Sequence, residues 1–366
     1  MALHDRILHA LQQRLRTVVV LSSTITALLL SSVPSGAFAL TNPTWTLRSI
    51  DNMHASRDFV CWQQSPSFMA AVAQAEKSAN TNYAAIATPY DAPANYHQCS
   101  MPKDPIAYET AWVQALRAAG LQIWFRQTWF NWEGSYGAPK LTSTTTPAIK
   151  PGTATNVLNG TDTTSYMAKT YHFILDHRGL FANGDIFTPE AEPQNGGIRQ
   201  SYGGCNISCQ FEDWPSLNRW LRDSMTVHTA AFRQLGLSVT VGYWGLPCSN
   251  NKWNGANNIE ASTITQMIFY VTDCYYKDVP TLVSHLELIH NAYNAPVIVG
   301  EWGEIWDTDP VTVQREVGSA MSAVSTLPYI RGFNYWQGYG GSGGEGLIDK
   351  TTLTLNQTGL VVKSKF

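Results

Sequence analysis

The stretch GDIFTPE, residues 184–190, joins an apolar run to an acid at its carboxyl end, and a second acid, Glu192, follows two residues later. Ile186 and Phe187 are typical of a buried β-strand, and the turn Pro-Gln-Asn-Gly-Gly at 193–197 marks its end. A buried carboxylate loses solvation unless partners or a wet cleft compensate its charge. The stretch therefore predicts a strand that delivers acids to a cleft.

Short apolar runs of the same kind recur along the chain and alternate with longer amphipathic segments. With 184–190 they make eight predicted strands, the others being residues 44–50, 82–88, 121–128, 238–244, 269–275, 295–301 and 331–336. The clearest helical segments between them are residues 105–120, 165–179, 216–236, 281–293 and 311–325. Eight strand-and-helix units in about 300 residues predict a single-domain α/β fold, the (β/α)8 TIM barrel.

The lengths of the connections support a barrel with an elaborated face. Helix-to-strand links are as short as Ala-Gly, Leu-Gly or Asn-Ala, whereas long segments follow the strands at 132–163, 194–213, 245–260 and 338–346. Long loops of this kind usually carry function. We therefore expect the functional residues at the end of the barrel where the strands finish.

The amino terminus has the pattern of an export signal. Arg6, Arg14 and Arg16 precede an uncharged stretch at 17–30, and Ala37-Phe38-Ala39 fits an A-x-A cleavage site. A membrane anchor is the weaker interpretation, because Ser and Thr interrupt a stretch that is shorter than the ~20 residues of a span. We expect a signal peptide at 1–39, a catalytic barrel at 40–366, and a protein that is secreted, either extracellular or periplasmic.

Composition narrows the class of partner. The net charge is −3 with His neutral, and there are no runs of Lys and Arg, which argues against binding to nucleic acid or to a membrane after signal cleavage. Only 14% of residues are charged, whereas 11% are aromatic. Although core packing accounts for most aromatic rings, this balance favours a neutral carbohydrate as partner. We expect a monomer.

The cysteines indicate disulfides and not a metal centre. In an exported chain, six cysteines suggest a disulfide framework with 15 possible pairings, among which the sequence does not choose. Cys205 and Cys209 lack a second pair at zinc-site spacing, and no HExxH motif is present. The sequence predicts no metal and no cofactor. The six cysteines are Cys61, Cys99, Cys205, Cys209, Cys248 and Cys274.

Acids at strand ends can meet across the barrel mouth. Glu190 and Glu192 close the fourth predicted strand, and Glu301 closes the seventh within VIVGEWGE. Hydrolysis of a glycosidic bond needs two such carboxyls, one to protonate the leaving oxygen and one for the sugar carbon. A separation of about 5 to 5.5 Å predicts retention of configuration and about 6.5 to 9.5 Å predicts inversion, so both outcomes stay open at this point, as does transglycosylation.

Three motifs in this order resemble those of the clan A retaining glycoside hydrolases, with family five the nearest relative. They are Glu192-Pro193, Gly300-Glu301-Trp302-Gly303 and Phe333-Asn334-Tyr335-Trp336. The resemblance implies that Glu192 is the acid/base, that Glu301 is the nucleophile, and that Trp336 lies under the sugar at the cleavage point. Asp273-Cys274-Tyr275 stands where the family often has His-x-Tyr, which implies a hydrogen bond from Tyr275 to Glu301.

Two departures from the family pattern indicate a divergent branch. Ala191 replaces the Asn that usually precedes the acid/base, so Gln194 and Asn195 become candidates for its sugar contact. No Arg ends the second predicted strand, which leaves Arg126 in the third strand, or Arg57, to steady the nucleophile. These departures keep open a second class of function, a sugar-binding barrel without catalysis.

Further candidates come from the strand ends and the loops. Glu190 is either the acid itself or a neighbour that raises the pKa of Glu192 by charge repulsion. Tryptophans at strand ends are candidates to line sugar subsites, and His54 is a candidate for a sugar hydroxyl, although a lone His is more often structural. For Glu301, the alternative is a structural ion pair with an Arg. The tryptophan candidates are Trp129, Trp244 and Trp302, beside Trp336.

Overall fold

The computed structural model divides the chain into two units, residues 1–41 and 42–366. All described residues belong to the second unit, so the predicted signal peptide at 1–39 lies outside them. The described residues are 45–52, 65–87, 95–96, 99–100, 105–126, 151–189, 191, 214–245, 248, 259–264, 269–340 and 346–366.

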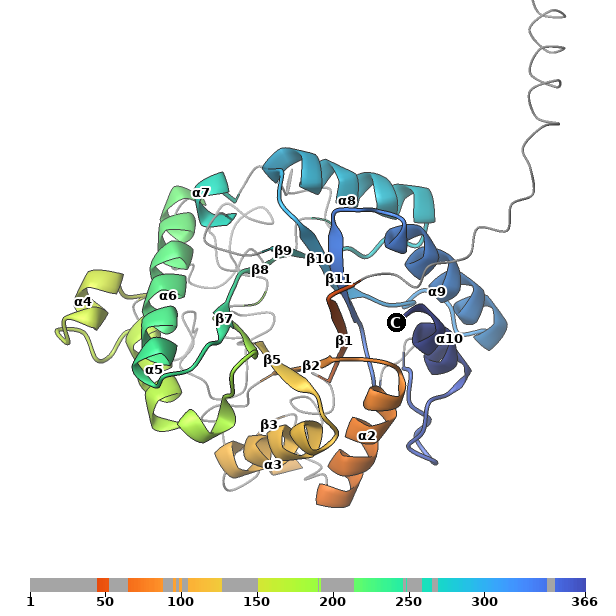
Figure 1. Ribbon diagram of the computed structural model, residues 1–366, viewed down its shortest axis with the longest axis horizontal. Coiled ribbons are helices and arrows are strands. Elements are labelled where there is room, and N and C mark those ends of the chain that lie inside the picture. The colour runs from red at the N-terminus through yellow and green to blue at the C-terminus, as the bar shows by residue number, and fades with distance from the viewer. Residues whose placement is uncertain are drawn as a thin grey trace, which may run out of the picture. The chain divides into compact units, whose positions relative to one another are not determined.

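A sheet of nine parallel strands forms the centre of the second unit, in the order β7-β6-β5-β2-β1-β11-β10-β9-β8 (Figure 1). A separate antiparallel pair, β3 (Asn95–Tyr96) and β4 (Cys99–Ser100), lies in the segment between β2 and α3. The nine strands are β1 (Leu47–Asp51), β2 (Tyr83–Ala87), β5 (Gln122–Arg126), β6 (Ile186–Thr188), β7 (Thr240–Val241), β8 (Trp244–Gly245), β9 (Tyr270–Asp273), β10 (Val297–Trp302) and β11 (Ile330–Tyr335).

The two outermost strands of this order are parts of one interrupted barrel strand. β7 pairs with β6 through Ile186↔Thr240, and β8 pairs with β9 through Trp244↔Val271. Only two residues, Gly242 and Tyr243, separate β7 from β8, so the segment 240–245 joins both ends of the sheet and closes it. The barrel therefore has eight strand positions, one for each predicted strand, and the predicted (β/α)8 class is confirmed.

Helices surround the strands, as Figure 1 shows. The predicted helical segments correspond to α3, α5, α6, α8 and α9, and α2 and α10 complete the longer helices among the described residues. These are α2 (Pro66–Ser78), α3 (Pro105–Ala118), α5 (Tyr166–Asp176), α6 (Trp214–Gln234), α8 (Val279–Tyr293), α9 (Pro310–Ser325) and α10 (Gln357–Lys365). Shorter ones are α4 (Ala154–Leu158), η3 (Arg178–Leu180) and α7 (Ala261–Ile264).

Capping residues explain why α8 starts before its predicted boundary. The Asp278 side chain accepts a hydrogen bond from the Thr281 N–H at 2.9 Å, and Pro280 occupies the first turn, where its missing N–H costs nothing. Asp309 caps Thr312 in the same way at the start of α9. The helices therefore begin directly after the capping Asp, in Asp-x-Pro for α8 and in Asp-Pro for α9, and not at the first residue of the apolar pattern.

The barrel interior is packed with eight apolar side chains that come from seven of the eight strand positions, since β6 and its continuation supply two and β11 supplies none. The Trp124 and Trp244 rings are the largest members, with centroids 4.4 Å apart. Close packing of this kind makes a barrel core rigid. The side chains at the carboxyl ends of the strands therefore rest on a firm layer. The eight members are Leu47, Ala85, Trp124, Ile186, Ala191, Trp244, Val271 and Ile298.

One of the predicted disulfides joins two strand-end segments. Cys248, which follows β8, is bonded to Cys274, which follows β9, with Cα atoms 4.6 Å apart. The side chains of the other four cysteines lie outside the described residues. The bond fastens the chain directly before Tyr275.

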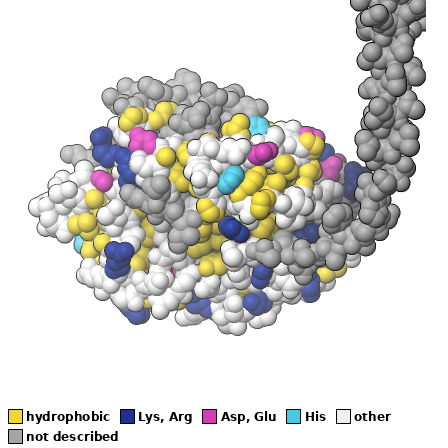
Figure 2. Space-filling view, turned by 45° about the horizontal axis from the view of Figure 1, so that its top comes forward, with side chains coloured by type: hydrophobic (Ala, Val, Ile, Leu, Met, Phe, Trp, Pro, Cys, Tyr) yellow, Lys and Arg dark blue, Asp and Glu magenta, His cyan; other side chains and the backbone are white. Residues whose placement is uncertain are grey.

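The described surface and helices bear on the predicted partners. On the face in Figure 2, the coloured Lys and Arg side chains do not gather into one large patch. No helix among the described residues is both long and apolar enough to cross a bilayer. Within the same residues, no three His, Cys, Asp or Glu side chains come together as a metal site.

Candidate active site

Glu301 stands at the carboxyl end of β10, and only 4% of its surface is exposed. The strand delivers it in register with Asp273 of β9. Gly300 allows this close approach, because a Cβ atom there would lie 2.6 Å from Asp273 Oδ1 and 2.9 Å from Trp244 Nε1. The Gly-Glu pair thus combines close strand packing with a carboxylate at the barrel mouth.

Arg126, at the end of β5, supplies the charge that Glu301 needs. Its side chain is fully buried and forms an ion pair with Glu301 Oε1 through Nη2 and with Asp51 Oδ2, at 2.8 Å, through Nη1. The guanidinium carbon lies 4.1 Å from the centre of the Trp244 ring. Buried charges are tolerated only when paired, so the three residues form one unit. The Arg from the third strand thus makes the contact for which it was a candidate; Arg57 lies outside the described residues.

Asp51 and Asn334 are site residues that the sequence interpretation missed. Asp51 ends β1 and is fully buried, and Asn334 Nδ2 donates to Asp51 Oδ2 at 3.1 Å and to the Gly300 carbonyl at 2.7 Å. Asp51 carries the same signal as Glu301, an acid directly after an apolar strand. Asn334 belongs to a motif already recognised. Both link β1 and β11 to β10, the strand that carries Glu301.

Tyr275 holds the second oxygen of Glu301. Its hydroxyl donates to Glu301 Oε2 at 2.9 Å, which is the contact that the resemblance implied. Beside it, the Trp244 indole N–H donates to Asp273 Oδ1 at 2.6 Å. With Arg126 on Oε1, the carboxylate has a donor on each oxygen, and its orientation is determined by both.

Replacing Tyr275 with Phe should lower kcat by about 10- to 100-fold, because one hydrogen bond to a charged group is lost. Steady-state kinetics of the pure variant measures this loss. Tyr276→Phe is the matched control, and an unchanged kcat in Tyr275→Phe would contradict a role for the contact.

Trp336 follows β11 and is half-buried, with its ring centre 5.8 Å from the Arg126 guanidinium carbon. Its backbone N–H donates to the Trp302 carbonyl at 3.0 Å, and the peptide bond to Gln337 is cis. A Cβ at Gly303 would fall 1.6 Å from the Trp336 carbonyl oxygen. Gly303 in the Gly-Glu-Trp-Gly motif is therefore required for the approach of Trp336 to the segment that follows Glu301.

Two tryptophans predicted to contact substrate are packing residues in this structure. Trp244 and Trp302 are both fully buried, so neither ring presents a face to solvent. Trp244 lies under Arg126 inside the barrel, and the Trp302 indole donates to the Tyr276 carbonyl at 3.1 Å. The sequence pattern placed both residues correctly at strand ends, but their side chains point into the core. Periodicity could not predict this direction, because the alternation of side chains is not reliable at the end of a strand.

The other predicted site residues lie outside the described residues, although the chain around the predicted acid is partly described. Ala191 forms a parallel β-bridge with Trp244 of the neighbouring strand segment and belongs to the inner cluster of the barrel, and Tyr166 donates to the Pro189 carbonyl at 2.9 Å. The residues directly before Glu192 are thus anchored beside the Arg126 support. The residues outside are Glu190, Glu192, Gln194, Asn195, Trp129 and His54.

A further buried acid lies behind this unit on α2. Glu76 is fully buried, and burial raises the pKa of its carboxyl well above the usual value. The Asn52 side chain lowers this pKa in part, and the charge on Asp51 raises it further. A protonated carboxyl is compatible with that surrounding. A Cβ at Gly338 would lie 3.0 Å from Glu76 Oε1. The glycine after the Trp336-Gln337 pair thus accommodates this polar group.

Glu304, three residues beyond Glu301, is also buried, and its Oε1 accepts the N–H groups of Trp306 at 2.9 Å and Asp307 at 3.1 Å. Burial raises the pKa of Glu304 to about 7, and the facing Glu316 carboxyl on α9 adds to the rise, whereas the Trp306 N–H and Lys277 lower it. The carboxyl therefore titrates close to neutrality and ties the loop after β10 to α9.

We expect this acid to make stability depend on pH. Its folded pKa lies above the unfolded value, so its contribution is fully present below about pH 4.5 and is lost as pH rises through about 7. Glu304→Gln keeps an acceptor for both N–H groups without the charge. Between pH 5.5 and 8, urea unfolding should show the wild type losing about 1 to 3 kcal/mol more than this variant. The exposed substitution Glu287→Gln is the control, and equal losses in all three proteins would exclude the assignment.

Comparisons with known proteins bear on the fold. No protein-family model and no curated protein matches the sequence. A GH5_18 protein from Streptomyces cattleya in complex with GlcNAc matches the structure with a TM-score of 0.63 and 11% identity, over 88% of this chain and 80% of that one. A fungal β-1,4-galactanase matches at 0.57 and 14%, over 88% and 100%, and a GH113 β-1,4-mannanase at 0.51 and 11%, over 87% and 97%.

These similarities agree with the resemblance that the motifs suggested. Identities of 10 to 14% across such matches compare folds and not sequences. The chain is therefore similar in fold to glycoside hydrolases of clan A, as a divergent form of the same (β/α)8 barrel.

Proposed function

We propose that this protein is a secreted retaining β-glycoside hydrolase that cleaves a β-linked polysaccharide or oligosaccharide. The observation that supports this most is Glu301, a slightly exposed carboxylate at a strand end with Arg126 on one oxygen and Tyr275 on the other. These two partners hold the carboxylate in one orientation, as a nucleophile requires. The fold neighbours include a β-1,4-galactanase and a β-1,4-mannanase, which supports a β-linked substrate.

In the proposed reaction, Glu301 attacks the anomeric carbon while the bond from that carbon to the leaving oxygen breaks. Glu192 gives its proton to the leaving oxygen and, in the second step, takes a proton from water. The water oxygen bonds to the anomeric carbon and releases the Glu301 carboxylate, so two inversions give net retention. Trp336, beside the Arg126 support, is proposed to stack under the sugar ring.

Stereochemistry tests this proposal directly. Purified protein is screened against β-glucans, mannans, xylans and galactans, and proton NMR follows the first anomer released from the best substrate. The expected first product is the β anomer. An α anomer released first would replace the proposal with an inverting enzyme, and tight glycan binding in calorimetry without any reducing-sugar product would replace it with a sugar-binding barrel.

The role of Glu192 has its own test. Glu192→Ala should retain the first step on aryl glycosides whose leaving groups need no proton, while losing activity on natural glycans. The parallel variant Glu190→Ala distinguishes the two neighbouring acids, because only the true acid/base should show this dependence on the leaving group. The export proposal is tested by the intact mass of the secreted protein, which should begin at residue 40.

A further inference from the structure

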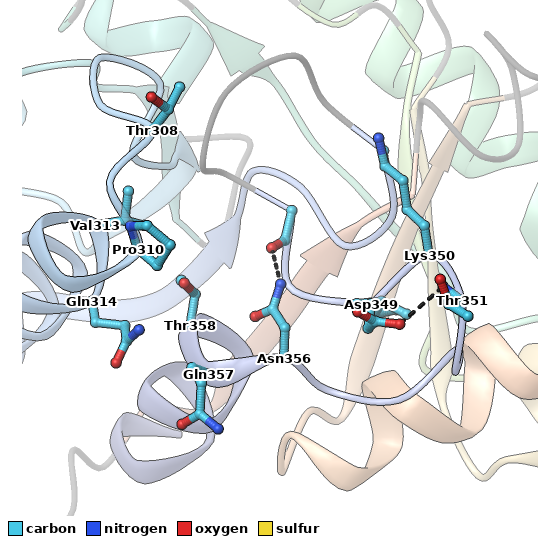
Figure 3. Close-up of a pocket in the computed structure, with 13 residues that line it drawn as sticks. Thr308, Pro310, Val313, Gln314, Asp349, Lys350, Thr351, Asn356, Gln357 and Thr358 are labelled. Carbon is cyan, nitrogen blue, oxygen red and sulfur yellow. Dashed lines mark hydrogen bonds between the residues drawn. The ribbon is translucent and has the colours of Figure 1, made fainter.

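A cavity of about 460 Å³ lies outside the barrel centre, between the start of α9 and the segment that leads from β11 to α10. Its polar lining includes Thr308, Gln314, Lys350, Thr351, Gln357 and Thr358, which Figure 3 shows as sticks. The volume falls within the range of small-molecule sites, about 300 to 1,000 Å³. None of these residues takes part in the Glu301 arrangement.

The cavity lies at the same end of the barrel as the candidate active site. Thr308 belongs to the connection after β10, the strand that carries Glu301, and Gly340 belongs to the connection after β11, directly beyond Trp336. Connections that follow strands gather at the carboxyl end of a barrel. A chain-like ligand that extends from one site could therefore reach the other.

Two of the lining side chains are used to build the cavity. Asp349 Oδ1 accepts the N–H groups of Thr351 at 2.9 Å and Thr352 at 2.7 Å, and Asn356 caps α10 through Gly359 at 2.9 Å while donating to the Gly346 carbonyl at 2.6 Å. Figure 3 shows the bonds of Asn356 and Asp349 among the residues drawn. These bonds fix the turn and the helix start, so the cavity has a defined shape.

The remaining polar groups suit an uncharged, hydroxylated ligand. The amides of Gln314 on α9 and Gln357 on α10 make no hydrogen bond to other residues within the described part of the chain. Each amide offers a donor and an acceptor, as sugar hydroxyls require. Asp349 and Lys350 balance in charge, so the lining does not favour an anion or a cation.

An exposed tryptophan precedes the first lining residue of the cavity in the connection after β10. Trp306 is 40% exposed and the preceding Ile305 is 42% exposed, and Trp306 lies two residues before Thr308 in the same connection. The hydrogen bond from its N–H to Glu304 holds its backbone in place. A flat ring with a solvent-facing surface covers the apolar face of a sugar.

We propose that this cavity, together with Trp306, is an accessory site that binds a neutral glycan chain beyond the cleavage point. The inference rests on the proposed glycosidase function for the identity of the glycan. The site would hold polymeric substrates on the enzyme and would add nothing to the hydrolysis of a substrate that occupies the catalytic centre alone.

The test compares long and short substrates. The double variant Gln314→Ala/Gln357→Ala and the single variant Trp306→Ala are assayed on the preferred polymer and on a small aryl glycoside of the same sugar. Loss of two hydrogen bonds should raise KM for the polymer about five- to tenfold, with kcat/KM on the aryl glycoside within about twofold. Gln74→Ala/Gln114→Ala, which removes exposed amides on α2 and α3, is the matched control.

Binding is measured separately from catalysis. In the inactive Glu301→Gln background, affinity electrophoresis in gels with neutral β-glycans or with polygalacturonate should show retention by the neutral glycan, reduced by the cavity variants. Retention and polymer KM that do not change in the variants would overturn the accessory site, as would retention by polygalacturonate alone. If Glu301→Gln still hydrolysed the glycan, the proposed mechanism would be overturned. The electrophoresis result would then still show whether the cavity binds glycan, because that measurement does not depend on catalysis.

Discussion

Replacement of Glu301 by Gln is expected to lower kcat/KM on a β-glycan by at least about 10⁴-fold, because the amide cannot form the glycosyl-enzyme bond. The variant should remain folded. Gln has nearly the same volume and can still accept the Tyr275 hydroxyl, and Arg126 keeps its ion pair with Asp51. Steady-state kinetics and thermal unfolding of the pure variant measure both effects.

A second substitution separates a nucleophile from a structural acid. Glu301→Ala leaves space beside the Arg126 guanidinium, where a small anion such as azide can take the place of the carboxylate. Azide should restore turnover of an activated aryl glycoside and give a glycosyl azide of inverted configuration. Activity close to wild type in Glu301→Gln would show that another group is the nucleophile. The same conclusion would follow if azide did not rescue Glu301→Ala and a covalent glycosyl intermediate formed on a different residue.

Replacement of Arg126 by Met is expected to destabilise the fold by about 3 to 5 kcal/mol, because it leaves Asp51 and Glu301 buried without their cation. Catalysis should fall as well, since Glu301 loses its charged partner on one oxygen. Urea unfolding measures the first effect, and steady-state kinetics of the pure variant measures the second.

A double variant tests the cause of that loss. Asp51→Asn/Arg126→Met removes one of the two uncompensated charges, so it should recover part of the stability that Arg126→Met loses. Arg315→Met removes an exposed Arg with a loose 3.7 Å contact to Glu316 and should change stability by no more than about 0.5 kcal/mol. If Arg126→Met were as stable as Arg315→Met, the buried unit of three charges would not exist as described.

Local patterns predicted the strands because burial leaves a direct trace in the sequence. An apolar run such as Val297–Val299 identifies a core strand wherever it occurs, and an acid at its end, like Glu301, is conspicuous. The short helix-to-strand links and long strand-to-helix links then predicted which end of the barrel carries function. Tyr275 and Trp336 followed from a motif resemblance, and the structure places both beside the Glu301 unit.

Contacts between distant strands could not be predicted in the same way. Asp51 and Arg126 are 75 residues apart, and although the motif resemblance made Arg126 a candidate partner of Glu301, nothing in the sequence signals that the same guanidinium also binds Asp51. The burial of Trp244 and Trp302 could not be predicted either, because it depends on the direction of a side chain at the end of a strand. The accessory cavity forms between two connections, one after β10 and one after β11. Only the packing of the folded chain brings these two connections together.

The amino-acid sequence by itself therefore determined the barrel and the acid at the end of its seventh strand, and it predicted the functional end, because each depends on residues that are neighbours in the chain. Only the tertiary structure decided which charges compensate that acid and which aromatic rings are buried. The physical reason is that a buried charge is stabilised by whatever lies within a few ångströms of it, and in a closed barrel those partners come from strands that are far apart in sequence.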